Sequence, residues 1–173
     1  MSKNFSSPCG RETHKIISDF LKTQQPDVEV LSASAHLDYN EATDLVGIIH
    51  ESRYQIARRV RGFYAMENLA WRWQYTFRVQ TPNDRETEIH KIRDGNGDFY
   101  FYGFGEDGVG IKRWTIFSLD RWRIHDLNGT LGRCWKVPNN DGTAGMAWDF
   151  RSTPDIILAA SYRPPSAQLK LVI

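Results

Sequence analysis

The chain has 173 residues, of which 40% are apolar and 25% are charged, a composition that suits one domain with a full hydrophobic core and argues against disorder. Its two cysteines, Cys9 and Cys134, form no CxxC pair, which excludes the signatures of a zinc knuckle and of a disulfide framework. The sequence has neither an apolar leader nor about eighteen consecutive apolar residues, so we expect no membrane association and a cytoplasmic location. The formal net charge of +1 hides a strong local separation of charge, described below.

The first half of the chain predicts a helix followed by strands. Residues 1–11 are expected to form a flexible arm, and the spacing of apolar residues predicts a helix over 12–22. Its expected buried stripe is Ile16, Ile17, Phe20 and Leu21. Strands are predicted at 28–31, 43–50, 54–62 and 74–80, while 63–73 fits either a surface loop or a short helix.

The second half predicts a helical segment at 86–92, capped by Asn83 or Asp84, and then mainly strands. The expected elements are a turn at 94–98, strands at 99–104 and 111–119, a helical turn at 120–125, a long loop at 128–145 and late strands at 148–150 and 156–161. Residues 103–108 match the spacing GxGxxG, but a strand is predicted after them instead of a helix, so we interpret them as a hairpin turn. The sequence therefore predicts a single α/β (α+β) domain over residues 12–162, with a mixed central sheet flanked by helices, and a tail at 163–173.

Charges of opposite sign occupy two successive predicted strands and their approaches. Residues 27–51 contain six carboxylates and no Lys or Arg, whereas residues 53–81 contain six arginines and one glutamate. Carboxylates bind hard metal ions through oxygen, and arginine forks match phosphate oxygens, so this junction is suited to a cation and a phosphate. The alternative is that the two strands lie side by side and neutralise each other through cross-strand ion pairs.

Aromatic residues and arginines alternate between Arg58 and Arg78. The residues expected to contact nucleic acid are Arg58, Arg61, Arg72, Trp71 and Trp73. Aromatic side chains beside guanidinium groups suit single-stranded or distorted nucleic acid, because the rings stack on bases while the charges bind phosphates. The alternative is a core of aromatic strands with arginines on the solvated face.

The order of a helix, a strand, a strand preceded by carboxylates, a basic strand, and then a helix and further strands resembles the PD-(D/E)xK nuclease superfamily. Asp44, within Glu41-Ala42-Thr43-Asp44-Leu45-Val46, matches the aspartate of that family's second strand. The stretches 98–104 and 114–123 are similar to segments of nuclease-like phage or prophage proteins. The resemblance implies a restriction-endonuclease-like fold, Mg²⁺ as the cofactor, and hydrolysis of a phosphodiester by a metal-activated water.

The third strand departs from that family, because Ala57-Arg58-Arg59 stands where Glu-x-Lys is expected. Arg59 can replace the lysine as a fixed positive charge, but Ala57 cannot bind a metal. The second carboxylate must then come from Glu41, Asp38 or Glu88, so the expected metal ligands are Asp44, Glu41, Asp38 and Glu88. Asp44, Glu41 and Arg59 are the expected catalytic residues, and Arg59 and Arg61 are expected to hold phosphate.

Three functions remain open at this point. The first is an Mg²⁺-dependent nuclease that acts on DNA or RNA. The second is a catalytically inactive phage accessory or counter-defence protein that binds nucleic acid or a nucleic-acid enzyme. The third is a protein-interaction domain whose exposed aromatic residues contact a protein partner.

Overall fold

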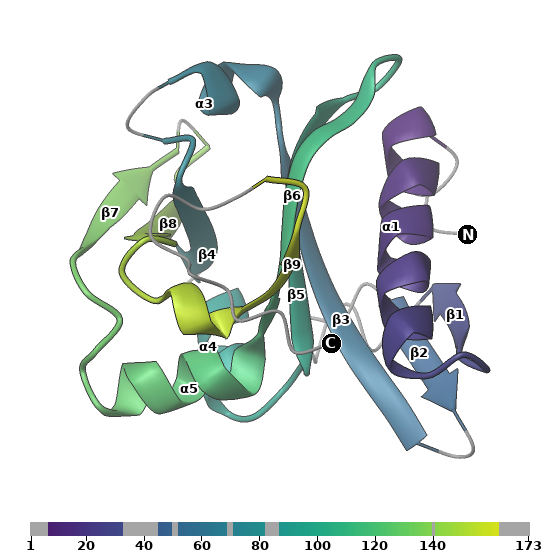
Figure 1. Ribbon diagram of the computed structural model, residues 1–173. Helices are drawn as coiled ribbons and strands as arrows, with labels where there is room; N and C mark the ends of the chain where they lie inside the picture. The colour runs from purple at the N-terminus through teal and green to yellow at the C-terminus, as the bar shows by residue number, and fades with distance from the viewer. Residues whose placement is uncertain are drawn as a thin grey trace.

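Two β-sheets organise the computed structural model, which describes residues 7–32, 45–49, 52–68, 71–81, 87–139 and 141–162. A six-stranded sheet lies in the middle, with one long helix on one face and a second layer of helices and strands on the other (Figure 1). The expected α+β domain with a mixed sheet flanked by helices is thereby confirmed.

The central sheet has the strand order β1-β2-β3-β5-β6-β9. Its strands are β1 (Glu29–Ser32), β2 (Leu45–Ile49), β3 (Ser52–Arg61), β5 (Phe99–Glu106), β6 (Gly110–Ser118) and β9 (Ile157–Ala160). All neighbours pair antiparallel except β3 and β5, which are parallel. The GxGxxG stretch ends in the turn between the antiparallel strands β5 and β6, where Gly108 has a φ of +90°, so the predicted hairpin is confirmed.

The long helix α1 (Pro8–Gln24) packs on one face of this sheet. It begins four residues before the expected start, because the Ser7 hydroxyl accepts a hydrogen bond from the Gly10 N–H and Pro8 suits the first helical position. The last four residues of the expected 1–11 arm therefore belong to α1. Ile17, Phe20 and Leu21 are buried, as the apolar stripe predicted.

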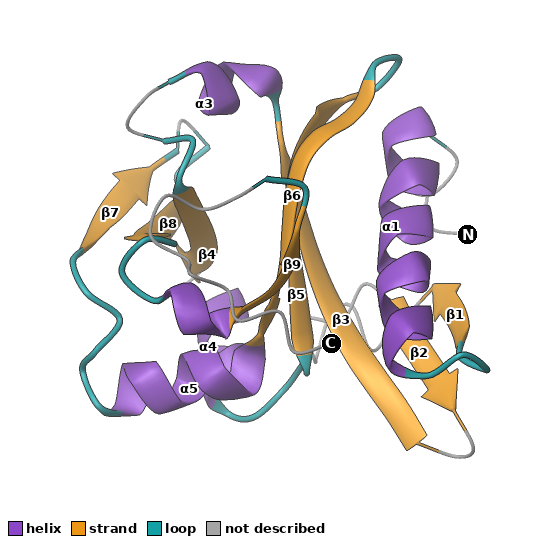
Figure 2. Cartoon of the chain, in the orientation of Figure 1, coloured by secondary structure: helices purple, strands orange, loops and turns teal. Residues whose placement is uncertain are grey.

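The opposite face carries a three-stranded antiparallel sheet of β4 (Gln74–Gln80), β8 (Ala144–Asp149) and β7 (Cys134–Pro138) (Figure 2). The same layer contains α3 (Phe63–Glu67), α4 (Glu88–Arg93), α5 (Leu119–Leu127) and the 3-10 turn η2 (Pro154–Ile156). For the segment 63–73, where the sequence allowed a loop or a short helix, the structure has the short helix α3 and a turn at 71–73. The prediction of a long loop over residues 128–145 is wrong, because this stretch contains β7 and the start of β8.

Aromatic rings fill the space between the two sheets. Tyr75 of β4 lies 4.7 Å from Phe150, 5.1 Å from Phe117 and 5.9 Å from Trp148, measured between ring centroids. All four residues are at most 3% exposed. This core fixes β4 against β5 and β6, and with it the turn at residues 71–73 that enters β4.

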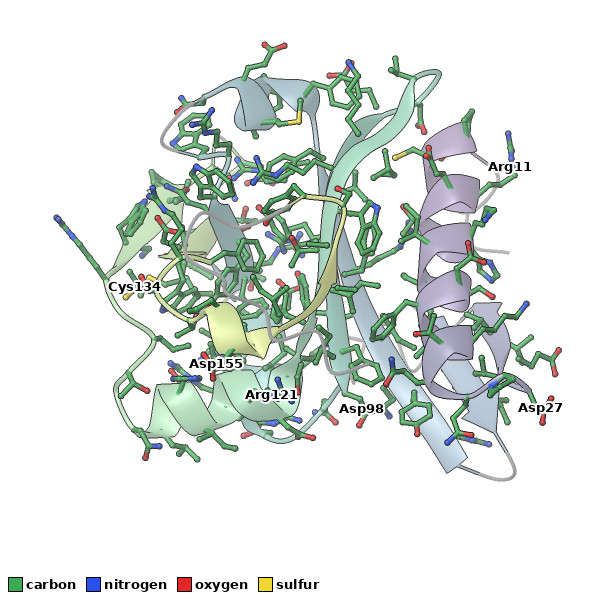
Figure 3. The ribbon with its side chains drawn as sticks, in the orientation of Figure 1. Arg11, Asp27, Asp98, Arg121, Cys134 and Asp155 are labelled. Atoms are coloured by element: carbon green, nitrogen blue, oxygen red, sulfur yellow. The ribbon has the colours of Figure 1, made fainter. Side chains whose placement is uncertain are left out.

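Asp98 precedes β5 at one end of the central sheet, where its carboxylate accepts a hydrogen bond from the Gln55 N–H at 2.7 Å (Figure 3). Burial raises the pKa of Asp98, although this hydrogen bond opposes the shift. The folded chain therefore holds this proton more tightly than the unfolded chain, so the Asp98 contribution to stability is lost as pH rises above about 3.9. Asp98→Asn keeps a hydrogen-bond acceptor but cannot ionise. We therefore expect its free energy of unfolding, measured in urea relative to that of wild type, to increase as the pH rises from 4 to 7. A relative stability that stays constant or falls over this range would refute the assignment.

The two cysteines lie in different environments. Cys9 in α1 is 8% exposed, whereas Cys134 in β7 is exposed. Burial raises the pKa of the Cys9 thiol, and the nearby charges of Asp107 and Glu12 raise it further. We expect iodoacetamide to modify Cys134 rapidly and Cys9 only slowly until the protein is unfolded, as peptide mass spectrometry can measure. Equal rates at the two sites in the folded protein would contradict this placement.

Candidate nucleic-acid interface

The arginines of β3 are divided between the two faces of the central sheet. Ile56 packs in the core under α1, while Ala57 packs in the aromatic core on the other side. Side chains alternate along a strand, so Arg58 lies on the α1 face and Arg59 and Arg61 lie on the face toward β4. Strand alternation over 54–61 in the sequence also predicts that Arg59 and Arg61 share one face and that Arg58 lies on the other.

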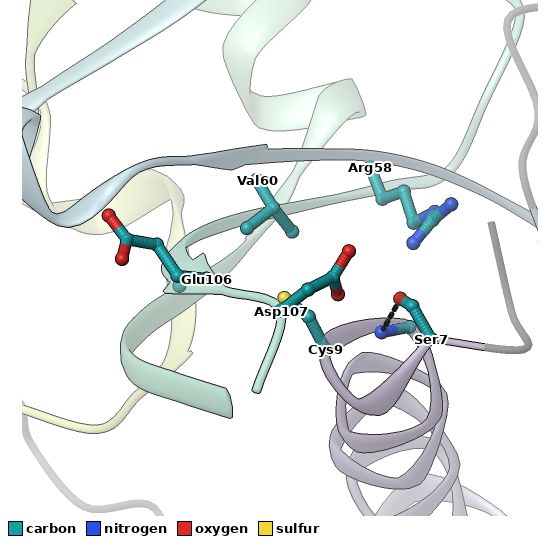
Figure 4. Close-up of a pocket in the computed structure, with 8 residues that line it drawn as sticks. Ser7, Cys9, Arg58, Val60, Glu106 and Asp107 are labelled. Atoms are coloured by element: carbon teal, nitrogen blue, oxygen red, sulfur yellow. Dashed lines mark hydrogen bonds between the residues drawn. The ribbon is translucent and has the colours of Figure 1, made fainter. Parts of the chain in front are cut away.

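Arg58 lines a pocket on the α1 face, away from the other predicted nucleic-acid residues. The pocket has a volume of about 370 Å³, and its lining includes Ser7, Cys9, Val60 and Asp107. The Arg58 side chain extends from β3 toward the start of α1 (Figure 4). The structure therefore does not bring Arg58 together with Arg61, Arg72, Trp71 and Trp73.

On the opposite face, Arg59 forms an ion pair with Glu88 of α4 at 2.8 Å. The side chains are 25% and 16% exposed, respectively. The Tyr100 hydroxyl donates to Glu88 Oε1 at 2.7 Å, and the Arg78 N–H donates to Glu88 Oε2 at 2.8 Å. Arg59 also donates to the Thr76 hydroxyl at 3.3 Å. The network thus joins β3, β4, β5 and α4.

The protonation states in this network favour its hydrogen bonds. Burial raises the pKa of Tyr100 well above its ordinary value, and the charge of Glu88 adds to the shift, so the hydroxyl keeps the proton that it donates. Burial alone would lower the pKa of Arg59, but the effects of Tyr100 and Glu88 outweigh it and the pKa is raised. Arg59 is therefore charged at neutral pH, and it forms its ion pair with the Glu88 carboxylate in that state.

Glu88 is the only expected metal ligand that lies among the described residues. Asp38, Glu41 and Asp44 lie outside them, so their expected convergence on a metal stays a prediction. Arg59, Tyr100 and the Arg78 N–H take three of the roughly four acceptor positions of the Glu88 carboxylate, which leaves little room for a cation. Across the described ranges, no group of three or more His, Cys, Asp or Glu side chains is placed to hold a metal ion.

A second group of residues gathers arginines around aromatic rings. We call it the arginine-aromatic cluster, and it consists of Arg61, Trp71, Arg72, Trp73, Arg113, Arg151 and Tyr162. Arg61 ends β3, the residues 71–73 form the turn before β4, Arg113 comes from β6, and Arg151 and Tyr162 follow β8 and β9. The cluster therefore depends on both sheets being in place.

Trp73 lies at the centre of the cluster. The guanidinium carbons of Arg113, Arg72 and Arg151 are 4.1, 5.6 and 5.9 Å from its ring centroid. Arg113 also lies 3.6 Å from the ring centroid of Tyr162, which meets Trp73 edge to face at 5.5 Å. Cation-π contacts of this kind contribute about 0.5–2 kcal/mol each.

Trp71 and Arg61 extend the cluster toward β3. The guanidinium carbon of Arg61 lies 5.8 Å from the Trp71 ring centroid, and Trp71 is 37% exposed. Burial raises the pKa of the neighbouring Tyr102, although the positive charge of Arg61 opposes the shift. Tyr102 is therefore neutral at pH 7 and does not cancel the charge of Arg61.

The carboxylate of Asp149 contacts the cluster, where it is bound by Arg151, whose Nε donates to its Oδ1 at 2.9 Å. Among the residues that the structure describes, the cluster thus combines four guanidinium groups with one carboxylate. Asp149 neutralises Arg151, whereas the guanidinium carbons of Arg113 and Arg72 lie 4.1 and 5.6 Å from one ring centroid, so these two like charges repel each other. A bound anion with several negative charges would relieve this repulsion.

The sequence predicts four members of the cluster, Arg61, Trp71, Arg72 and Trp73, but not the other three, Arg113, Arg151 and Tyr162. These three residues lie about 40 to 90 positions further along the chain, Arg113 within β6 and the other two in turns after β8 and β9. Arg113-Trp114 in a predicted strand was the available signal, since it repeats the pairing of Arg72 with Trp73.

Comparison with protein-family models and with curated protein sequences gives no match to this chain. In the part of the chain that the structure describes, no helix is both long enough and apolar enough to cross a membrane.

Proposed function

We propose that this protein binds nucleic acid through the arginine-aromatic cluster. The observation that carries the proposal is the concentration of Arg72, Arg113 and Arg151 within 5.9 Å of the ring centroid of Trp73. Phosphate groups complement guanidinium forks, and bases complement aromatic rings. A polymer that carries both groups fits this surface better than a small anion does, because the cluster spans several arginines and two tryptophans.

Salt dependence tests the proposal. The affinity of a fluorescein-labelled 20-nucleotide DNA strand should fall steeply between 50 and 200 mM NaCl in fluorescence anisotropy, because counterions are released when arginines neutralise phosphates. Arg72→Ala should weaken binding and reduce the slope of log K against log salt by about 0.7, the value for one phosphate of a single strand. Lys22→Ala, which removes an exposed cation from α1 on the other side of the sheet, should leave the slope unchanged. The proposal fails if wild type does not bind at 50 mM NaCl, or if Arg72→Ala and Lys22→Ala behave alike.

Mg²⁺-dependent cleavage of the bound strand is a second proposal. Its support is the observed order of α1, the antiparallel strands β1, β2 and β3, and then α3, which keeps the order on which the resemblance to PD-(D/E)xK nucleases rests. Cleavage requires Asp44 with Glu41 or Asp38 as the metal ligands, because Glu88 is engaged by Arg59 and Tyr100. We expect Mg²⁺ to support cutting by wild type and not by Asp44→Ala. An intact strand after incubation of the wild-type complex with Mg²⁺ or Mn²⁺ would leave binding as the sole activity.

A further inference from the structure

The two tryptophans of the cluster differ in what already covers them. Trp73 is contacted by the guanidinium of Arg113 and by the edge of Tyr162, and it is only partly exposed. Trp71 is 37% exposed, and the guanidinium carbon of Arg61 lies 5.8 Å from its ring centroid. Trp73 thus orders the arginines, while Trp71 offers ring surface to a ligand.

The position of Trp71 also suits a planar ligand attached to phosphates. It stands in the turn before β4, directly next to Arg72, and Arg61 approaches it from the end of β3. A base stacked on its ring would place the adjoining phosphates within reach of these two arginines. Stacking on tryptophan needs the face of a base, which a single strand exposes and a duplex buries between neighbouring base pairs.

We propose that Trp71 is a stacking platform for an unpaired base, and that the cluster therefore selects single-stranded nucleic acid over duplex. This inference rests on the proposed binding function. It assigns separate roles within the cluster, because the arginines bind the phosphates of either form while Trp71 distinguishes them.

The test compares three labelled DNA probes of one 20-nucleotide sequence, namely the single strand, its duplex, and a single strand in which abasic residues replace the central bases. Wild type should bind the single strand about 10-fold more tightly than the abasic strand, because one stacked base on an aromatic ring contributes a factor of this order. Trp71→Ala should lose about the same factor on the intact strand and nothing further on the abasic strand. Trp71→Phe should retain part of the preference, and Leu127→Ala, which removes an 86% exposed side chain from α5, should behave as wild type.

The outcomes separate this inference from the binding function. Tight, salt-sensitive binding of single strand and duplex with equal affinity would overturn the stacking role of Trp71 and leave the proposed function standing. Equal losses from Trp71→Ala on intact and abasic strands would also overturn it, since the ring would then act without contacting a base. Failure of wild type to bind any probe would overturn the binding function itself.

Discussion

Replacing Glu88 by alanine should lower the free energy of unfolding by about 3 kcal/mol, because removal of one partner leaves a largely buried charge without compensation. Arg59 would keep its 3.3 Å hydrogen bond to Thr76 but lose its charged partner. The Tyr100 hydroxyl and the Arg78 N–H would both lose their acceptor. Glu88 is also the first residue of α4, where its negative charge interacts favourably with the positive end of the helix dipole. Urea unfolding followed by circular dichroism measures the change.

Asp19→Ala provides the matched control. Asp19 pairs with Lys15 on the surface of α1, where the two side chains are 59% and 75% exposed, so its loss should change stability by less than about 0.5 kcal/mol. Glu88→Gln should fall between the two variants, since an amide oxygen can still accept from Tyr100 but carries no charge. If Glu88→Ala is as stable as Asp19→Ala, the Arg59 network does not hold the second layer to the central sheet.

Reversing the charges of Arg61 and Arg72 to glutamate should weaken binding of single-stranded DNA by about 100-fold or more at 50 mM NaCl. Each substitution would remove a charge-assisted hydrogen bond to phosphate, worth about 1.5–3 kcal/mol, and the new carboxylate would repel the phosphate. Replacement of the same two residues by lysine should restore part of the affinity, because lysine keeps the charge without the guanidinium fork. Fluorescence anisotropy measures the affinity, and circular dichroism checks that each variant folds.

The control variant replaces Lys15 and Lys22 of α1 by glutamate, which gives the same change in net charge on a distant surface. If binding depends on the location of the charge, this variant should lose far less affinity than the Arg61 and Arg72 variant. Similar losses from both pairs would mean that general electrostatic attraction, and not the arginine-aromatic cluster, brings the nucleic acid to the protein.

The fold could be predicted wherever local periodicity coincides with burial. The alternation of Tyr75 and Phe77 gave β4 its bounds from the sequence, because both residues face the aromatic core. β7 was missed because it is a short edge strand that ends in Pro138 within a stretch rich in Gly and Asn. Its alternation of partly buried Trp135 and Val137 with exposed residues is too brief to predict a strand without the pairing with β8. The start of α1 was missed because its signal is the capping hydroxyl of Ser7 and the following Pro8, which precede the apolar stripe.

The candidate site could be predicted only in its contiguous part. Strand alternation placed Arg58 and Arg59 on opposite faces, and the density of arginine and tryptophan near residue 72 indicated part of the candidate binding surface. The contacts of Trp73 with Arg113 and Tyr162 join positions some 40 and 90 residues apart, so they arise from sheet packing that no local pattern encodes. For Glu88 the sequence suggested a metal ligand, and the structure shows a partner for Arg59.

The most direct measurement of the central claim uses the indole N–H signals of the six tryptophans in a ¹H-¹⁵N correlation spectrum. Titration with a single-stranded 20-nucleotide DNA should shift the signals of Trp71 and Trp73, assigned by Trp71→Phe and Trp73→Phe, and leave those of Trp114 and the buried Trp122 in place. A binding-dependent shift confined to Trp114, on the α1 face, or no shift at any tryptophan, would contradict the assignment of the arginine-aromatic cluster as the nucleic-acid interface.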